Sequence, residues 1–297
     1  MKVHTANLFT GLPLVILAAF FWGVGGGIAG LLLDKGWSPL VIAAFRAFIG
    51  LLFIIFWYLS HKKVKLTLNR SLIFWSVVAG CGMAGNIGFY FISITETNIP
   101  IASTLMYTAP VFVLIISALF RIEIITKIKL GATIVVITGI VLLTGVYNMS
   151  FLNISTWGIM SGLLSGLSYA IFIFGYKYSS AFGNYITVLM VSAFTELILL
   201  FSFSEKLQFL QVVTHLKDFV FFLLLGFVGA GLALFFYVVG LKKVMPGSAS
   251  VVAMIEPVTA SSFGIFILGQ FINEVQFIGM IIILMTVTFL SYYTIKE

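Results

Sequence analysis

The chain has 297 residues, of which 61% are hydrophobic and only 8% are charged. A water-soluble fold needs more polar surface than these residues supply, so the composition excludes a soluble globular protein and predicts one that lies in lipid. The net charge of +7 is compatible with nucleic-acid binding, but the placement of the basic residues, described below, excludes that role.

Ten stretches are apolar enough, and at about 20 residues long enough, to cross a bilayer as helices. In chain order they run over 11–33, 38–59, 71–93, 98–120, 128–147, 154–175, 184–203, 218–241, 246–268 and 275–294. The first is longer than the apolar core of a signal peptide and lacks a convincing cleavage site, so we interpret it as a retained helix. The least distinct boundaries separate the third from the fourth span and the eighth from the ninth.

The sixteen Lys and Arg residues test this segmentation, because basic residues accumulate in cytoplasmic connections. Lys35, Lys206 and Lys217 fall in one set of alternate connections, Arg46 falls inside a span, and the other twelve fall in the set that includes both termini. The bias favours an even number of spans and a multi-pass protein of the cell membrane with both termini cytoplasmic. The basic surplus therefore reflects topology, and no nucleic-acid partner is expected.

An internal repeat divides the chain near its middle. A shift of 147 positions places identical or similar residues on one another at ten sites: Gly11 on Gly158, Leu17 on Leu164, Trp22 on Tyr169, Phe74 on Phe221, Gly82 on Gly229, Tyr90 on Tyr237, Ala102 on Ala249, Ser103 on Ser250, Pro110 on Pro257 and Val111 on Val258. We therefore expect two five-helix repeats, over 1–150 and 151–297. Because five is an odd number, the repeats must insert with opposite orientations, which is an arrangement found in many secondary transporters.

These residues resemble the drug/metabolite transporter superfamily, and specifically its EamA-type ten-helix carriers. The resemblance covers most of the chain and rests on the order and duplication of short motifs. Those of the first half are Trp22-Gly23, Arg46, Asn86, Ala102-Ser103, Ala109-Pro110-Val111, Glu123 and Gly131; those of the second half are Tyr169, Tyr237, Ala249-Ser250, Ile255-Glu256-Pro257-Val258 and Gly279. One departure is Gly269-Gln270, where the second half of such proteins often carries Gly-Glu.

The resemblance implies an all-α membrane protein in which two inverted bundles enclose a central cavity. It also implies a small-molecule substrate such as an amino acid, a nucleobase, a vitamin, a drug or a sugar derivative. An acid at position 270 can have no role in this chain, because the residue is Gln270.

Three ionisable residues fall inside predicted spans, where a charge is costly and usually faces a cavity or a partner. Arg46 and Glu196 lie at the same depth on equivalent helices, and they are candidates for an ion pair or a gate; Arg46 could also extend to the membrane surface. Glu256 lies near mid-membrane, directly before Pro257. It is the strongest candidate for binding a substrate or a coupling proton, and the alternative is a neutral side chain that only stabilises helix packing.

Pro110 and Pro257 occupy equivalent positions in the fourth and ninth spans. A proline removes a backbone donor and loosens the helix before it, and matched irregularities in two repeats point to a transporter's binding site. Ordinary kinks are the alternative. Aromatic and amide side chains are candidates to line a cavity for an organic substrate, although packing is the favoured interpretation for each one taken singly. They are Trp22, Tyr107 and Tyr169 at mid-membrane depth, and Asn86 and Tyr90 nearer the outside.

Glycines crowd two spans of the first half. They are Gly23, Gly25, Gly26, Gly27 and Gly30 in the first span and Gly80, Gly82, Gly85 and Gly88 in the third. Close helix packing is the main interpretation, and a flexible hinge is the alternative.

The sequence has no metal-ligand cluster, nucleophile motif or nucleotide-binding loop, so neither an enzyme nor a bound cofactor or metal is expected. We therefore predict a secondary transporter that moves a small organic metabolite by alternating access, with export as one of its possible directions. A passive channel and, less favoured, a membrane-embedded enzyme remain the alternatives.

Overall fold

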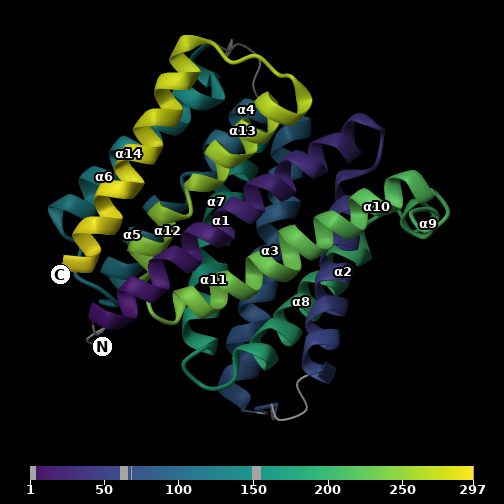
Figure 1. Ribbon diagram of the computed structural model, residues 1–297, viewed down its shortest axis with the longest axis horizontal. Coiled ribbons are helices and arrows are strands. Elements are labelled where there is room, and N and C mark those ends of the chain that lie inside the picture. The colour runs from purple at the N-terminus through teal and green to yellow at the C-terminus, as the bar shows by residue number, and fades with distance from the viewer. Residues whose placement is uncertain (1–4, 61–65, 68, 149–154, 297) are drawn as a thin grey trace.

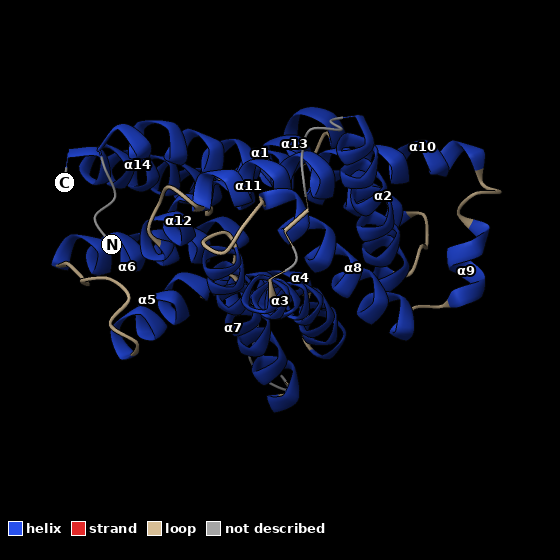
Figure 2. Cartoon of the chain, turned by 90° about the horizontal axis from the view of Figure 1, so that it is seen from below, coloured by secondary structure: helices blue, strands red, loops and turns tan. Residues whose placement is uncertain are grey.

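The computed structural model describes residues 5–60, 66–67, 69–148 and 155–296, and all regular secondary structure in these ranges is helical (Figures 1 and 2). Ten helical segments are long and apolar enough to cross a membrane. Each overlaps one of the predicted spans, with ends that differ by a few residues. The predicted start of the sixth span at 154 and the predicted boundary between the repeats at 150–151 lie outside the described residues.

The first five spans occupy the N-terminal half of the chain. Their helices are α1 (Thr5–Asp34), α2 (Pro39–Ser60), α3 (Arg70–Glu96), the pair α4 (Ile99–Met106) and α5 (Ala109–Leu119), and α6 (Lys127–Thr144), followed by a short turn η1 (Val146–Asn148). The third and fourth spans are distinct because the side chain of Asn98 accepts a hydrogen bond from Ile101 N, 3.0 Å away, and so begins a new helix.

The last five spans have the same order with two additions. The helices are α7 (Thr156–Ser179), α8 (Tyr185–Phe203), α9 (Lys206–Gln211), the continuous segment α10 (Leu216–Leu224), η2 (Leu225–Leu232) and α11 (Ala233–Leu241), then α12 (Pro246–Val252), α13 (Ile255–Leu268) and α14 (Glu274–Lys296). The sequence did not predict the short helix α9 or the π-helical turns of η2. The wider turns occur where Gly226 and Gly229 bring η2 against α2 and α1.

The two repeats interlock. The first helix of each repeat packs against the third and fourth spans of the other: α1 contacts η2, α11 and α13, while α7 contacts α3, α4 and α5. The second spans of both repeats pack together as α2 and α8, and the fifth spans as α6 and α14. This exchange is the contact pattern expected of two inverted repeats related by a pseudo-twofold axis.

The two ends of the molecule can be named from the chain path. The start of α1 and the end of α14 lie at one end of the molecule (Figure 1), which we call the termini face; the last turns of α2, α5, α7 and α11 lie there too. The last turns of α1, α3, α6, α8 and α13 lie at the opposite face. Successive spans therefore run alternately between these two faces.

Candidate functional site

A cavity of about 590 Å³ lies between the repeats. Its walls come from α1, α2, α3, α4, α6, α7, η2 and α13, and it includes Leu33, Ile94, Ile99, Leu268 and Gln270 close to the opposite face. No lining residue comes from the connections at the termini face. The cavity therefore descends from the opposite face to the middle of the bundle.

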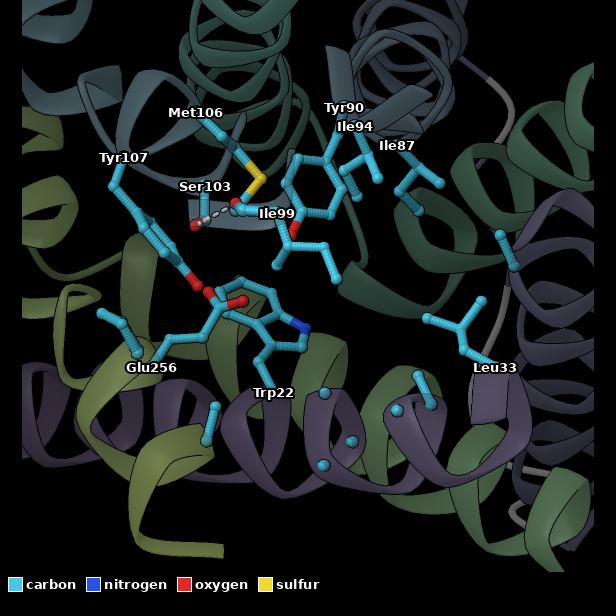
Figure 3. A pocket seen from close by; sticks show the side chains of 18 of the residues that line it. Trp22, Leu33, Ile87, Tyr90, Ile94, Ile99, Ser103, Met106, Tyr107 and Glu256 are labelled. Carbon is cyan, nitrogen blue, oxygen red and sulfur yellow. Dashed lines mark hydrogen bonds between the residues drawn. The ribbon is translucent and has the colours of Figure 1, made fainter. Parts of the chain in front are cut away.

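Glu256 and Tyr107 meet at the floor of this cavity. The hydroxyl of Tyr107 points at the carboxylate of Glu256, which also lies beside the indole ring of Trp22 (Figure 3). The sequence predicted all three as site candidates, and the fold brings them together from α1, from the break between α4 and α5, and from α13.

The breaks in the fourth and ninth spans place these two polar groups. One span stops at Met106 and resumes at Ala109, so Pro110 lies in the first turn of α5; the other stops at Val252 and resumes at Ile255, so Pro257 lies in the first turn of α13. Shorter-range hydrogen bonds replace the α-helical ones there, from Thr108 N to Leu105 O at 3.2 Å and from Glu256 N to Ala253 O at 3.0 Å. Glu256 thus begins a helix beside the cavity instead of lying within one.

An aromatic cluster surrounds Trp22. Its ring centroid lies 4.8 Å from that of Tyr237, 6.1 Å from Phe172 and 6.5 Å from Tyr169. Tyr169 is buried and lines the cavity, and its hydroxyl has no hydrogen-bond partner among the described residues. The hydroxyl of Tyr237 also has no partner among the described residues, so the cluster at the floor of the cavity combines aromatic rings with two unpaired hydroxyl groups.

Asn86 and Tyr90 enter the cavity wall from α3. Tyr90 projects into the open space (Figure 3). Asn86 also lines it, but its amide donates to both the carbonyl and the hydroxyl of Ser165, each at 3.1 Å. Asn86 therefore joins α3 to α7, and its role in packing is visible in the structure.

Arg46 and Glu196 form an ion pair, with 3.3 Å between Nη2 and Oε1. Arg46 lines the cavity and its side chain is 21% exposed, whereas Glu196 is 1% exposed and lies behind it. Neither Arg46 Nε nor Glu196 Oε2 has a hydrogen-bond partner among the described residues. The structure thus contains the ion pair between Arg46 and Glu196, and a role of this pair as a gate stays a prediction.

The crowded glycines of α1 serve two purposes. A Cβ at Gly23 would lie 2.6 Å from Glu256 O and 2.8 Å from Ala260 N, so the absent side chain lets α1 and α13 touch. A Cβ at Gly30 would meet no atom within 4 Å, and Gly30 lines the cavity. Packing therefore explains Gly23, whereas Gly30 leaves space open.

Two polar contacts that the sequence did not predict lie at the termini face; the first joins the two repeats, and the second joins two helices of the second repeat. Glu123 accepts hydrogen bonds from Gly247 N at 2.6 Å and from Ser117 Oγ at 3.1 Å, and it pairs with Lys129 at 3.0 Å. Lys177 donates to the carbonyls of Leu241 at 2.8 Å and Val244 at 2.5 Å. The available signals were the place of Glu123 in the repeated motif and the position of Lys177 in the last turn of a span.

The described residues hold no cluster of three or more His, Cys, Asp or Glu side chains that could bind a metal ion. The polar side chains that line the cavity supply a carboxylate, phenolic and aliphatic hydroxyls, two amides and an ion-paired guanidinium. Such a set can bind and orient an organic molecule in an apolar enclosure.

A family model settles what kind of protein has this arrangement. The model of the EamA-like transporter family matches the chain twice, over residues 9–145 and 156–292. The chain belongs to the EamA-like transporter family. Its ten spans, two repeats and central cavity agree with the fold expected from the resemblance, and the names of the family and of its relatives point to a transporter, not to an enzyme.

Curated relatives of this EamA-like transporter are named as transporters too. It is 26% identical over 306 residues to the uncharacterized transporter YwfM of Bacillus subtilis (strain 168), with 98% of this chain and 95% of that protein covered. It is 25% identical to the uncharacterized inner membrane transporter YedA of Escherichia coli (strain K12), with 86% of this chain and 83% of that protein covered. A protein of known crystal structure shares its fold with a TM-score of 0.76 at 15% identity, with 97% of each chain covered.

Proposed function

We propose that this protein is a secondary carrier that moves a small organic metabolite across the cytoplasmic membrane by alternating access. The observation that carries the proposal is a cavity that reaches mid-membrane from the opposite face while the termini face is closed. The basic residues favour a cytoplasmic termini face, so the cavity opens outward in this conformation.

The closed side is built from residues of the second repeat that are equivalent to residues lining the open side. Gly26, Gly27 and Gly30 line the cavity, and their equivalents 147 positions later are Ile173, Phe174 and Lys177. Ile173 and Phe174 are buried, and Lys177 ties the end of α11 to α7. Side chains thus fill at one face the space that glycines leave at the other, which supports a carrier over a channel open at both ends.

Glu256 offers a means of coupling. Its carboxylate is reached from the open side, where an inward-directed proton gradient would protonate it. We infer that a proton taken up there is exchanged for substrate that leaves the cell, so the proposed direction is export. A passive facilitator would use the same cavity without dependence on the gradient.

The matched residues Ser103 and Ser250 test alternating access. They are equivalent in the repeats, yet Ser103 lines the cavity and Ser250 is fully buried. In a background where Cys81 is replaced by Ser, Ser103→Cys should react with a membrane-impermeant maleimide added outside, and Ser250→Cys should resist reagents from both sides.

Conditions that favour a conformation open to the cytoplasm should reverse this labelling pattern. Ser103→Cys should then be protected, and Ser250→Cys should be labelled from the cytoplasmic side. Counterflow of labelled substrate in proteoliposomes is the companion measurement. Simultaneous labelling of both positions from opposite sides, with flux that does not saturate, would indicate a channel.

A further inference from the structure

The charges in and around the cavity do not balance. Arg46 is paired with Glu196, but Glu256 takes part in none of the ion pairs formed by the described residues. An ionised Glu256 therefore leaves one negative charge in a space whose walls are mostly apolar. A buried charge without a partner is costly, so this site favours a ligand that brings a positive charge.

We propose that the ligand of this cavity is a monovalent organic cation, an amine or ammonium compound with an aromatic or branched apolar body. The inference rests on the proposed carrier function and names its substrate class. Glu256 receives the cationic group, and the apolar body lies among the aromatic and aliphatic side chains above it.

Rings are placed to receive such a cation. The indole of Trp22 lies beside the carboxylate of Glu256, and Tyr107 and Tyr90 point into the same space (Figure 3). Ring faces of Trp and Tyr attract ammonium groups, most strongly where water is excluded. The hydroxyl of Tyr169, which is 3% exposed and has no partner among the described residues, adds a hydrogen-bond acceptor near the floor.

A zwitterion would need a second, positive subsite, and Arg46 is the cationic side chain in the cavity wall. Its guanidinium holds Glu196, which is 1% exposed. Drawing Arg46 toward a substrate carboxylate would leave Glu196 buried without its cation. Anions would in addition face the charge of Glu256, so cations are preferred over both classes.

A matched series of compounds separates these classes. The series is 3-phenylpropylamine, phenylalanine, 3-phenylpropionate and 3-phenylpropan-1-ol, which carry similar phenylalkyl bodies and are a cation, a zwitterion, an anion and a neutral molecule at pH 7. Each is added to the detergent-purified full chain, and its binding is measured as the rise in unfolding temperature with concentration. The amine should stabilise the protein at the lowest concentration.

Glu256→Gln should weaken binding of the amine by about tenfold to a hundredfold, because a charge-assisted contact is lost. The control is Glu205→Gln, which removes an exposed acid at the start of α9 and should leave binding unchanged. If Glu256→Gln does not fold, Tyr107→Phe and Trp22→Leu replace it, and each should weaken binding of the amine more than binding of the alcohol.

The proposal is overturned if phenylalanine or phenylpropionate stabilises the protein at lower concentration than the amine. It is also overturned if the amine causes no shift in unfolding temperature up to millimolar concentration. Binding of the amine that is unchanged in Glu256→Gln, or in both Tyr107→Phe and Trp22→Leu where Glu256→Gln does not fold, would overturn it too. Counterflow in proteoliposomes distinguishes this failure from failure of the carrier function. Binding of the amine without counterflow would contradict the carrier, whereas counterflow of phenylalanine alone would uphold the carrier and contradict the cation.

Discussion

The rings of Trp22 and Tyr169 meet edge to face, with centroids 6.5 Å apart and planes at 75°. Tyr169 is the equivalent of Trp22 one repeat later, at a shift of 147 positions. A residue that touches its own equivalent must lie close to the axis that relates the repeats. The floor of the cavity is therefore close to the centre of the molecule.

Glu123→Gln should loosen the closure at the termini face. The carboxylate accepts from Gly247 N across the boundary between the repeats, and a hydrogen bond to a charged group contributes about 1.5–3 kcal/mol. In the Ser250→Cys reporter, labelling from the cytoplasmic side should increase about tenfold or more.

The control for this change is Glu205→Gln, whose side chain is exposed and takes no part in the closure. Unchanged protection of position 250 in the Glu123→Gln protein would show that this contact does not hold the face shut.

Alanine at Gly23 and at Gly30 should have opposite effects on stability. A Cβ at Gly23 meets Glu256 O at 2.6 Å, and such overpacking costs about 1–3 kcal/mol. A Cβ at Gly30 meets nothing within 4 Å, and alanine there should stabilise the helix by about 0.5–1 kcal/mol.

Unfolding temperature in detergent measures both effects. Larger residues at Gly30 extend the test to the cavity: Gly30→Phe should retain stability and lose ligand binding, because Gly30 lines the cavity. Equal destabilisation by the two alanine substitutions would contradict the expected difference between Gly23 and Gly30.

Arg46→Met should destabilise the protein by about 3–5 kcal/mol, because it leaves Glu196 buried without its cation. The double variant Arg46→Met/Glu196→Leu should recover most of this loss, since both charges are then absent. A double-mutant cycle on unfolding temperature supplies the comparison, and purely additive effects would show that the pair is not coupled.

Glu256→Gln should abolish the dependence of transport on a proton gradient, because an amide cannot bind and release the coupling proton. The protein should still fold, since glutamine retains the size of the side chain and an oxygen that can accept from the Tyr107 hydroxyl, which points at this position (Figure 3). The measurement is counterflow and gradient-driven flux in proteoliposomes: counterflow of a neutral analogue should persist while gradient-driven flux is lost. Gradient-driven flux equal to that of the unmodified protein would remove Glu256 from coupling.

The closing contacts differ between the repeats. The equivalents of Glu123 and Gly247 are Gln270 in the second repeat and Pro100 in the first, so this pair has neither the carboxylate nor the backbone N–H that join at the termini face. Gln270 instead lines the mouth of the cavity. This difference favours the conformation in which the cavity opens to the opposite face, because the bond that closes the termini face has no counterpart of equal strength there.

The sequence by itself determined the ten spans, their alternation and the repeat, because lipid tolerates only long apolar helices and because basic connections mark one side. It also identified Glu256, Tyr107 and Trp22 as site candidates at mid-membrane depth. The sequence did not predict the roles of Glu123, Lys177 and η2, because each role depends on a neighbour that lies far away in the sequence.

Only the tertiary structure decided which candidates share one space. The side chain of Asn86 joins α3 to α7, Arg46 pairs with Glu196 behind the wall, and Gly23 packs while Gly30 stays open. The spacing along a helix shows which residues share a face, but the interlocking of the repeats sets what that face meets. The closed termini face and the cavity open to the opposite side follow from that packing.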